Sequence, residues 1–380
     1  MNLVRELEIS LKEKLIKGKV LILLGQRRVG KTVLLKKLLD QTNEKYLLFN
    51  GEDISVQELL SRRSVQHYQN IIGDNSILAI DEAQNIKEIG SILKLIVDSF
   101  LDLKIIVTGS SGFNLTEKTS EPLTGRKNQL FLFPFTEYEF LQIEKPNVRF
   151  DKMKDRLVFG SMPELVNLQN SKQKADYLRL LVDSYLIKDI LSFEALRNSS
   201  KILYLLKLIA YQIGKDVSLS ELGSQLSMSK NTIERYLDLL SKVFVVYRHY
   251  GFSKNLRKEV VKNQRWYFYD NGILNAIIAN FNPLEMRNDI GQLWENFMIS
   301  ERMKRQAYDG FITNNYYWRT YDKQEIDLIE ERGGKLYAYE FKWKEQKTKI
   351  PEAWKKSYQD SEFKQINSNN YSEWLKPNIN

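Results

Sequence analysis

Short apolar runs alternate with amphipathic segments over the first part of the chain. Three runs are apolar without interruption: LILL at 21–24, ILAI at 77–80 and IIV at 105–107, whereas residues 33–39 carry apolar side chains at helical spacing. Uninterrupted runs of this length indicate strands that are buried on both faces, as in a parallel sheet. Strands alternating with helices predict a doubly wound α/β domain over residues 1–145.

Helical spacing dominates the middle of the chain. The predicted elements are three helices and one alternating strand, at 201–214, 218–227, 229–243 and 244–251. Ser218 followed by Glu221 is a capping-box start for the second of these helices. Three helices followed by a pair of strands is the order of a winged helix, which we expect over residues 201–265.

The last third of the chain predicts a smaller α/β arrangement. An amphipathic helix at 291–306 precedes two strands, the first within 315–331 and ending at Asp327, the second at 335–343. No long low-complexity linker separates the parts of the chain. We therefore expect closely packed domains, the last of them over residues 266–380.

Composition narrows the class of protein. A chain of 380 residues exceeds one ordinary core and favours two to four domains, and 43% hydrophobic with 28% charged residues is typical of a folded protein. No apolar run approaches the roughly 20 residues of a transmembrane helix, and the amino terminus lacks the apolar core of a signal peptide. The absence of cysteine excludes disulfides and thiolate metal sites. These features predict a cytoplasmic protein with no membrane partner.

A phosphate-binding motif follows the first buried run. Residues 25–32, GQRRVGKT, fit G-x-x-x-x-G-K-[ST] without a mismatch. In this motif backbone N–H groups and a helix amino terminus cradle phosphates, the lysine reaches the β- and γ-phosphates, and the hydroxyl binds Mg²⁺. ATP and Mg²⁺ are therefore the expected ligands. The candidate nucleotide-binding residues are Gly25, Gln26, Arg27, Arg28, Val29, Gly30, Lys31 and Thr32.

Acidic and hydroxyl side chains follow the next predicted strands. Because parallel strands present their carboxyl ends at one edge of the sheet, we expect these side chains to meet the phosphate-binding motif. Asp81 is the candidate Mg²⁺ ligand, and Glu82 is the candidate base that orients and deprotonates the attacking water. Thr108 and Ser110 are both candidates to sense the γ-phosphate. Arg126 is a candidate arginine finger, within the chain or across a subunit boundary, with a structural arginine as the alternative.

These motifs bear a family resemblance. Four segments resemble the AAA-type ATPases of bacteria and archaea that carry a C-terminal domain of unknown function: GQRRVGKT, LAIDEAQ, IVTGSS and LTGRKNQLFLFPFTEYEF. Two later segments are similar to landmarks of the same family, FGSMPEL and WYFYDNGIL. The resemblance implies an AAA-type P-loop ATPase domain over residues 1–145 and, by analogy, a helical lid over residues 146–200. Gln84 in DEAQ departs from AAA proteins in general and leaves the two acids unaltered.

Basic residues interleaved with aromatic ones follow the third helix of the predicted winged helix. The formal charge of +9 favours binding to polyanions, and this mixture of side chains is typical of surfaces that contact phosphates and bases. DNA is therefore a candidate partner, while a protein-docking or purely structural module is the alternative. The residues are Arg248, Lys254, Arg257, Lys258, Lys262 and Arg265, with Tyr247, Tyr250, Phe252 and Trp266.

Three acids and a lysine in the last third resemble the arrangement of PD-(D/E)xK nucleases. They are Glu295 on the predicted helix, Asp327 on the first strand, and Glu340 and Lys342 on the second. The carboxylates would bind Mg²⁺ or Mn²⁺, and Lys342, on the same strand face as Glu340, would position the attacking water. Ile326 stands where the usual motif has proline. The alternatives are a silent domain held by salt bridges and a domain that binds nucleic acid without cleaving it.

The predicted fold class is α/β: an AAA-type P-loop doubly wound parallel sheet, then a helical lid, a winged helix and a restriction-endonuclease-like α/β domain. The leading function is an ATP-binding and ATP-hydrolysing protein that acts on DNA or another macromolecule. One alternative is a nucleotide-gated switch or scaffold with a protein partner and an inactive nuclease-like domain. Another is an ATP-gated, Mg²⁺-dependent DNA nuclease. An arginine finger from a neighbouring subunit would require a homo-oligomer.

Overall fold

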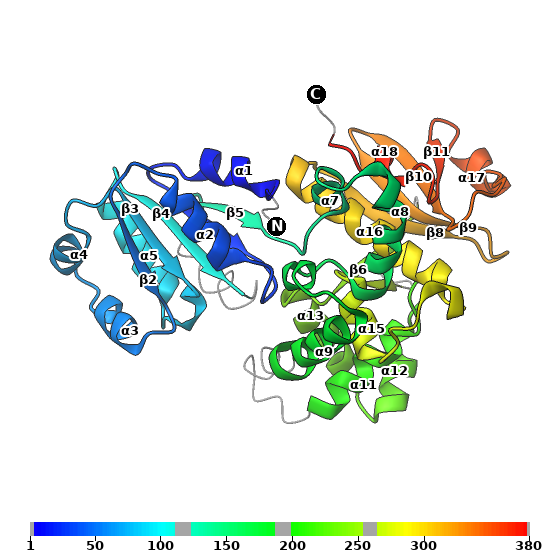
Figure 1. Ribbon diagram of the computed structural model, residues 1–380, viewed down its shortest axis with the longest axis horizontal. Helices are drawn as coiled ribbons and strands as arrows, with labels where there is room; N and C mark the ends of the chain where they lie inside the picture. Colours follow the sequence, from blue (N-terminus) through cyan, green and yellow to red (C-terminus); the bar gives the residue numbers. More distant parts are fainter. Residues whose placement is uncertain (1–3, 111–122, 187–198, 254–263, 378–380) are drawn as a thin grey trace. The chain divides into compact units, whose positions relative to one another are not determined.

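The three apolar runs near the start of the chain form the central strands of a five-stranded parallel sheet (Figure 1). The computed structural model describes residues 4–110, 123–186, 199–253 and 264–377. Contacts divide the chain into an N-terminal unit, residues 2–134 with 242–244, and a C-terminal unit, residues 135–241 and 245–380. Each unit has its own sheet and is described by itself.

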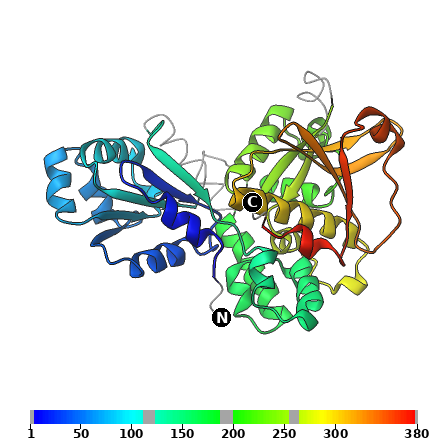
Figure 2. The same cartoon turned by 90° about the horizontal axis from the view of Figure 1, so that it is seen from above.

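The N-terminal unit is doubly wound. Its strands are β1 (Val20–Leu24), β2 (Tyr46–Asn50), β3 (Ile77–Asp81), β4 (Lys104–Gly109) and β5 (Lys127–Phe131). Its helices are α1 (Leu7–Lys14), α2 (Lys31–Asp40), α3 (Ile54–Ser61), α4 (Val65–Ile72) and α5 (Ile89–Ser99), with a 3₁₀ turn η1 (Ala83–Asn85). The strand order is β2-β3-β4-β1-β5, and helices cover both faces of the sheet (Figure 2). The predicted doubly wound parallel sheet is confirmed.

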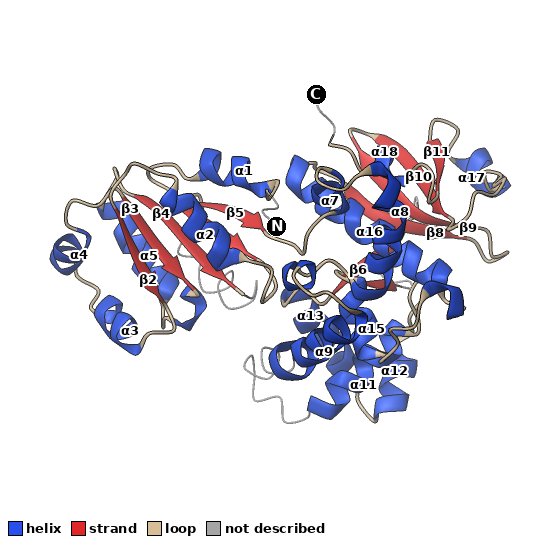
Figure 3. Cartoon of the chain, in the orientation of Figure 1, coloured by secondary structure: helices blue, strands red, loops and turns tan. Residues whose placement is uncertain are grey.

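The C-terminal unit has a helical part followed by a mixed sheet (Figure 3). Its first helices are α7 (Glu137–Leu141), α8 (Pro146–Phe159), α9 (Ser171–Leu181), α11 (Ser199–Ala210), α12 (Leu219–Leu226) and α13 (Lys230–Lys242), with short turns η2 (Pro163–Val166) and η3 (Val182–Leu186). Its later helices are α15 (Asn271–Ile277), α16 (Ile290–Asp309), α17 (Glu352–Ser357) and α18 (Tyr371–Trp374), with η4 (Leu284–Met286). Its strands are β6 (Val246–Gly251), β7 (Gln264–Phe268), β8 (Asn314–Arg319), β9 (Glu325–Arg332), β10 (Lys335–Phe341) and β11 (Glu362–Ile366).

Six strands form the sheet of the C-terminal unit in the order β11-β10-β9-β8-β6-β7. α16 packs against β7 and β10. Trp354 of α17, which is fully buried, packs with Trp318, Ile326 and Ile329 of the central strands. Gly333 and Gly334 join β9 to β10 with φ of 55° and 74°, as a two-residue turn between antiparallel strands requires.

The predicted winged helix does not stand apart from the predicted last domain. α11, α12, α13 and the β6–β7 hairpin follow the expected order. Ser218 caps α12 by accepting a hydrogen bond from the Glu221 N–H, which is one of the two bonds of the predicted capping box. β6, however, pairs in parallel with β8, so that the hairpin extends the sheet of β8 to β11. A two-stranded hairpin is marginally stable alone, and pairing with β8 gives it a neighbour. Residue 265 is therefore not a boundary between separate bodies.

The helices expected to form a lid belong to the C-terminal unit. α8 and α9 both pack against α15, more than 90 residues later in the chain. The two landmark segments meet at this junction. The buried Asp270 carboxylate accepts hydrogen bonds from the backbone N–H groups of Ser161 at 2.7 Å and Gly272 at 2.8 Å. Gly160 has φ of 74°, and a Cβ there would lie 2.0 Å from Asp270 Oδ1, so both the conformation and the space require glycine.

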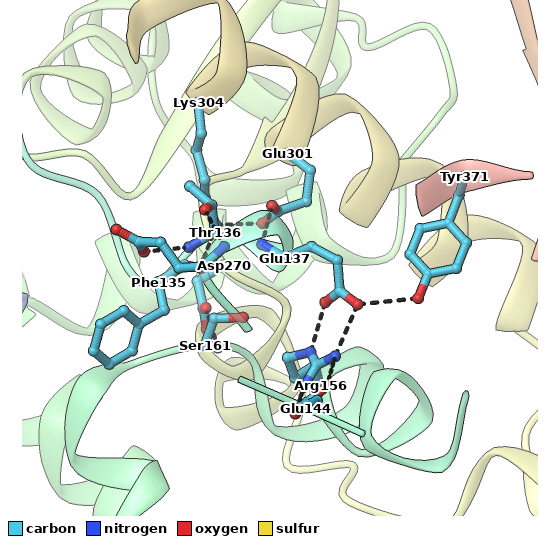
Figure 4. A network of polar contacts seen from close by, with 11 residues as sticks. Phe135, Thr136, Glu137, Glu144, Arg156, Ser161, Asp270, Glu301, Lys304 and Tyr371 are labelled. Atoms are coloured by element: carbon cyan, nitrogen blue, oxygen red, sulfur yellow. Dashed lines mark hydrogen bonds and ion pairs between the residues drawn. The ribbon is translucent and has the colours of Figure 1, made fainter. Parts of the chain in front are cut away.

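A buried network of charges surrounds the start of α7 (Figure 4). Arg156 of α8 binds Glu137 of α7 through two hydrogen bonds, at 2.6 and 2.8 Å, and Tyr371 of α18 donates to the same carboxylate at 3.0 Å. On the other side, Glu301 of α16 accepts from the Glu137 backbone N–H at 2.6 Å and pairs with Lys304. The network ties together four helices that are far apart in the sequence.

The segment predicted as one strand ending at Asp327 is two strands, so this prediction is wrong. β8 ends at Arg319, and a turn closed by a hydrogen bond from the Thr320 N–H to Gln324 O leads into β9, where Asp327 is the third residue. Lys323 in this turn has a positive φ of 61°. The turn carries no glycine or proline, so that the sequence pattern did not mark it.

Candidate functional site

The phosphate-binding motif forms the loop between β1 and α2. All five residues of β1 are buried, and Gly30, with φ of 96°, is the residue that caps α2. Arg28 also has a positive φ, of 65°. Such left-handed residues turn successive N–H groups inward to make an anion-binding concavity. The buried Lys31 ammonium donates to the carbonyl oxygens of Gly25 at 3.0 Å and Gln26 at 3.1 Å.

Gly25 is required by a close approach of backbone rather than by its own conformation. A Cβ at this position would lie 2.2 Å from the carbonyl oxygen of Leu132, which follows β5. The Leu132 N–H in turn donates to Leu24 O at 2.7 Å, so that the segment after β5 runs along the start of the loop. Any larger residue would displace the loop or this segment.

Asp81 connects the loop to the neighbouring strand. Its Oδ2 accepts a hydrogen bond from the Thr32 hydroxyl at 2.7 Å, and its Oδ1 accepts one from the Thr108 hydroxyl at 2.5 Å. Both hydroxyls can reach Asp81 at the end of β3, because Thr108 lies on β4, the strand between β1 and β3, and Thr32 follows β1. The donor set is oxygen only, which fits Mg²⁺, with Thr32 and Asp81 as the residues that would hold it.

Glu82 follows β3 and is held from several sides. Its N–H donates to the Thr108 hydroxyl at 3.0 Å. Its carboxylate accepts from the Gln84 side-chain amide at 2.5 Å, and the same amide nitrogen donates to Ser110 Oγ at 3.1 Å. Thr108 therefore contacts the two acids directly, whereas Ser110 contacts Glu82 only through Gln84.

Arg126 lies at the amino-terminal end of the strands, opposite to the end that carries the phosphate-binding loop. Its carbonyl oxygen accepts a hydrogen bond from the N–H of Val20, the first residue of β1, whereas the loop follows the last residue. Its guanidinium, half-exposed, pairs with Asp98 at 2.5 Å. Within one subunit Arg126 is therefore not brought to the phosphate-binding loop. Its ion pair with Asp98 agrees with the structural alternative, and a role across a subunit boundary stays a prediction.

Arg5 is a loop contact that the sequence did not reveal. It is buried just before α1 and donates to Val29 O in the loop at 2.9 Å and to Phe133 O beyond β5 at 2.6 Å. Glu8 of α1 accepts a hydrogen bond from Lys37 of α2 at 2.7 Å, which anchors α1 beside the loop. Because Arg5 binds backbone carbonyl groups, which every residue has, no sequence motif identifies its partners.

The candidate acids of the last third lie near one another in the C-terminal unit. Asp327 accepts a hydrogen bond from the Phe341 N–H at 2.8 Å, which places it beside Glu340, and Lys342 pairs with Glu340 at 2.6 Å. Glu295 of α16 accepts from the Tyr267 hydroxyl at 2.8 Å. A β-bulge interrupts the pairing of β8 with β9 between Tyr316 and Trp318, next to this group of acids.

Burial and mutual repulsion act on these acids together. Burial, and then the charges of Glu295 and Glu340, raise the pKa of Asp327 well above its ordinary value. Burial raises the pKa of Glu295 against the opposing effect of Arg265, and that of Glu340 against the opposing effect of Lys342. All three carboxyl groups are therefore harder to ionise than free ones.

Two basic side chains of the protein, Arg265 and Lys342, lie beside these acids. The buried Arg265 guanidinium lies 4.0 Å from Glu295 and 3.1 Å from Glu325, and Lys342 lies against Glu340. Among the described residues, no three acidic or histidine side chains are grouped so that they could hold a metal ion. As it stands, the cluster does not fit a metal centre built from Glu295, Asp327 and Glu340.

The basic and aromatic residues expected to contact DNA are only partly on the surface. Tyr247, Trp266 and Arg265 are buried. Arg248 is half-exposed and stacks on Tyr250, with 4.5 Å from its guanidinium carbon to the ring centroid. Because Tyr247, Arg265 and Trp266 are buried, they are not a stacking platform on the surface. Four more lie outside the described residues: Lys254, Arg257, Lys258 and Lys262.

Comparison with known families divides the chain into three matches. Residues 17–141 match the AAA domain family, residues 150–284 match a domain of unknown function (DUF8612), and residues 290–371 match another domain of unknown function (DUF4143). The expected AAA-type P-loop ATPase fold of the N-terminal unit is confirmed by the first match. No helix among the described residues is long and apolar enough to cross a membrane.

Two relatives that match most of the chain are uncharacterised proteins. The chain is 24% identical to the uncharacterised protein Rv2008c of Mycobacterium tuberculosis, over 89% of this chain and 73% of that protein. It is 23% identical to the uncharacterised protein MJ1544 of Methanocaldococcus jannaschii, over 86% and 74%. Among solved structures, the replication initiator DnaA bound to AMPPCP and single-stranded DNA aligns with a TM-score of 0.31 at 15% identity, over 62% of this chain and 86% of that one. A RuvB variant of Thermotoga maritima aligns with a TM-score of 0.30 at 17% identity, over 64% and 86%.

Proposed function

We propose that the N-terminal unit binds and hydrolyses ATP. The observation that carries the proposal is the unbroken line of hydrogen bonds from Thr32 through Asp81 to Thr108, at 2.7 and 2.5 Å, at the edge where the phosphate-binding loop lies. Phosphoryl transfer depends mainly on positioning and charge stabilisation, and this edge offers both. Neutralisation of phosphate charge is what Mg²⁺ supplies in such a site.

Each side chain of the site takes one part of this reaction. The N–H groups of residues 25–30 bind the phosphates, and the Lys31 ammonium exchanges its carbonyl partners for the β- and γ-phosphates. Glu82 accepts the proton of the attacking water. Thr108 and Ser110 face the γ-phosphate, Thr108 being tied to both acids. Arg126 acts on the nucleotide of a neighbouring subunit, which requires a homo-oligomer.

Turnover of ATP in Mg²⁺ tests the proposal. We expect Lys31→Ala to abolish binding of a fluorescent ATP analogue, and Glu82→Gln to keep binding and lose turnover. Lys36→Ala is the matched control, because Lys36 is an exposed lysine on the same helix. A parent protein that neither binds nor hydrolyses ATP, with Lys31→Ala indistinguishable from it, would end the proposal.

We further propose that the nucleotide state acts on DNA or another macromolecule through the C-terminal unit. The net charge of +9 and the helix pair α12–α13 support DNA. Lys230, Asn231 and Arg235 form an exposed face of α13, where a recognition helix would contact DNA. Turnover measured with and without duplex DNA, at two salt concentrations, tests this: stimulation that falls with salt supports DNA. No DNA effect, together with a partner protein bound only in ATP, would favour the switch or scaffold.

A DNA nuclease is the second candidate function. The convergence of Asp327, Glu340 and Lys342 favours it, whereas the buried Arg265 guanidinium beside Glu295 opposes it. Incubation of plasmid DNA with Mg²⁺ or Mn²⁺, for the parent, Asp327→Ala and Lys342→Ala, decides between cleavage and a silent domain. Cleavage by the parent that both variants lose supports the nuclease, and equal absence of cleavage in all three refutes it.

A further inference from the structure

Gln84 is the residue of the DEAQ segment to which the proposed reaction gives no part. It lies in η1, is 6% exposed, and reaches back toward the acid two residues before it. Its side-chain nitrogen donates both to Glu82 Oε2, at 2.5 Å, and to Ser110 Oγ, at 3.1 Å. One amide group therefore joins the acid that follows β3 to the hydroxyl that follows β4.

The backbone of Glu82 is also fixed, in a conformation that is uncommon for a residue other than glycine. Its φ and ψ are 49° and 43°, in the left-handed region. The Thr108 hydroxyl accepts from its N–H, and its carbonyl oxygen accepts from Asn85 through both the N–H at 3.1 Å and the side-chain amide at 3.2 Å. A Cβ at Gly51 would lie 2.5 Å from the same carbonyl oxygen.

Strained backbone that the surroundings hold from several sides is found at functional sites, where it orients a side chain. Here the strain directs the Glu82 side chain, and Gln84 fixes its far end. With the backbone set by Thr108, Asn85 and Gly51, the Gln84 amide is the group in the described part of the chain that fixes the Glu82 carboxylate by a hydrogen bond.

We propose that Gln84 is a positioning residue for ATP hydrolysis. Its amide group orients the Glu82 carboxylate toward the attacking water and couples the position of that carboxylate to Ser110. The inference rests on the proposed ATPase function and assigns Ser110 a role distinct from that of Thr108. Thr108 organises the two acids directly, whereas Ser110 acts on the base through Gln84. Contact of Ser110 with the γ-phosphate would therefore change the position of the Glu82 carboxylate through the Gln84 amide group.

The prediction for turnover is specific. Gln84→Met keeps the length of the side chain and loses its hydrogen-bond donors. We expect kcat to fall by about 10- to 100-fold, since a misplacement of about 1 Å costs about 100-fold in rate, while KM for ATP and the affinity for a fluorescent ATP analogue stay within about threefold. A merely structural role would change affinity and thermal stability along with kcat.

A double-mutant cycle identifies the link to Ser110. If Gln84 and Ser110 act as one unit, Gln84→Met combined with Ser110→Ala loses no more kcat than the more severe single variant. Multiplied losses would overturn the link, and a Gln84→Met variant with the kcat of the parent would overturn the positioning role. Gln41→Met, at an exposed glutamine after α2, is the matched control.

A second variant keeps the test decisive if Gln84→Met does not fold. Gln84→Asn retains the amide on a side chain one methylene shorter, and we expect an intermediate kcat at unchanged KM. Parent-like kcat in Gln84→Asn would overturn the proposal. Failure of the proposed ATPase function looks different, because the parent and Lys31→Ala would then be equally inactive, whereas here the parent is active and only the Gln84 variants are compared with it.

Discussion

The ion-pair network at the start of α7 allows a quantitative prediction for Arg156→Met. The Arg156 and Glu137 side chains are 6% and 0% exposed, and Arg156 also binds Glu144 at 2.7 Å. Replacing the guanidinium leaves the Glu137 carboxylate buried, with the Tyr371 hydroxyl as its one remaining hydrogen-bond donor among the described residues. Removing one partner of a buried pair costs about 3–5 kcal/mol, because the other charge loses its compensation.

Urea denaturation followed by tryptophan fluorescence measures this cost in the right part of the chain. All six tryptophans lie in the C-terminal unit, between residues 266 and 374, so the signal reports that unit alone. With a slope near 3 kcal/mol per molar urea, we expect the Arg156→Met midpoint to fall by roughly 1–1.7 M.

The control is an ion pair on the surface of the same unit. Lys376 and Glu373 lie 2.5 Å apart with side chains 57% and 75% exposed, and Lys376→Met should change stability by less than about 1 kcal/mol. Adding Glu137→Gln to Arg156→Met removes the stranded charge and should recover part of the loss. A shift no larger than that of the control, or no recovery in the double variant, would refute the reasoning.

Three other substitutions test separate features. Arg5→Met removes the hydrogen bonds to Val29 and Phe133, and we expect about tenfold weaker binding of a fluorescent ATP analogue, since losing the hydrogen bond that holds the loop carbonyl of Val29 costs about 1–3 kcal/mol; parent-like affinity would contradict it. Burial, then the charge of Arg265, lowers the pKa of His249 to about 3, so the parent should lose stability as the pH falls from about 6.5 toward 3, by up to about 1.4 kcal/mol per pH unit. His249→Phe should flatten that pH dependence in urea titrations, and equal slopes would show that the histidine is not its source. Gly160→Ala should destabilise the C-terminal unit strongly, whereas Gly291→Ala, with open space at its Cβ, should be neutral or slightly stabilising in the same assay.

Features that depend on short segments could be predicted from the sequence. The runs at β1, β3 and β4 are apolar because both faces of a parallel sheet are covered, and this alone predicts the doubly wound arrangement. The phosphate-binding loop is one contiguous segment, so the spacing of its residues in the sequence is enough to identify it. Ser218 at the start of α12 is likewise a local feature: its hydroxyl accepts a hydrogen bond from the Glu221 N–H, which is the serine half of the predicted capping box.

Features that depend on distant contacts could not be predicted in this way. Arg5 contacts Phe133, 128 residues later, through a backbone carbonyl, which carries no residue identity. Asp270 binds the N–H of Ser161, so the two landmark segments meet through backbone rather than through a recognisable pair of side chains. The parallel pairing of β6 with β8 joins the predicted winged helix to the predicted last domain, whereas the local sequence patterns had placed a domain boundary at residue 265.

The different surroundings of the two groups of acids argue for a division of labour between the units. Asp81 and Glu82 accept hydrogen bonds from neutral hydroxyl and amide groups, so that binding a cation there would displace no internal cation from these contacts. Glu340 and Glu295 instead lie beside the ammonium of Lys342 and the guanidinium of Arg265, and a metal ion would have to displace these cations against the cost of leaving them unpaired. This contrast favours chemistry in the N-terminal unit and binding, rather than cleavage, in the C-terminal unit.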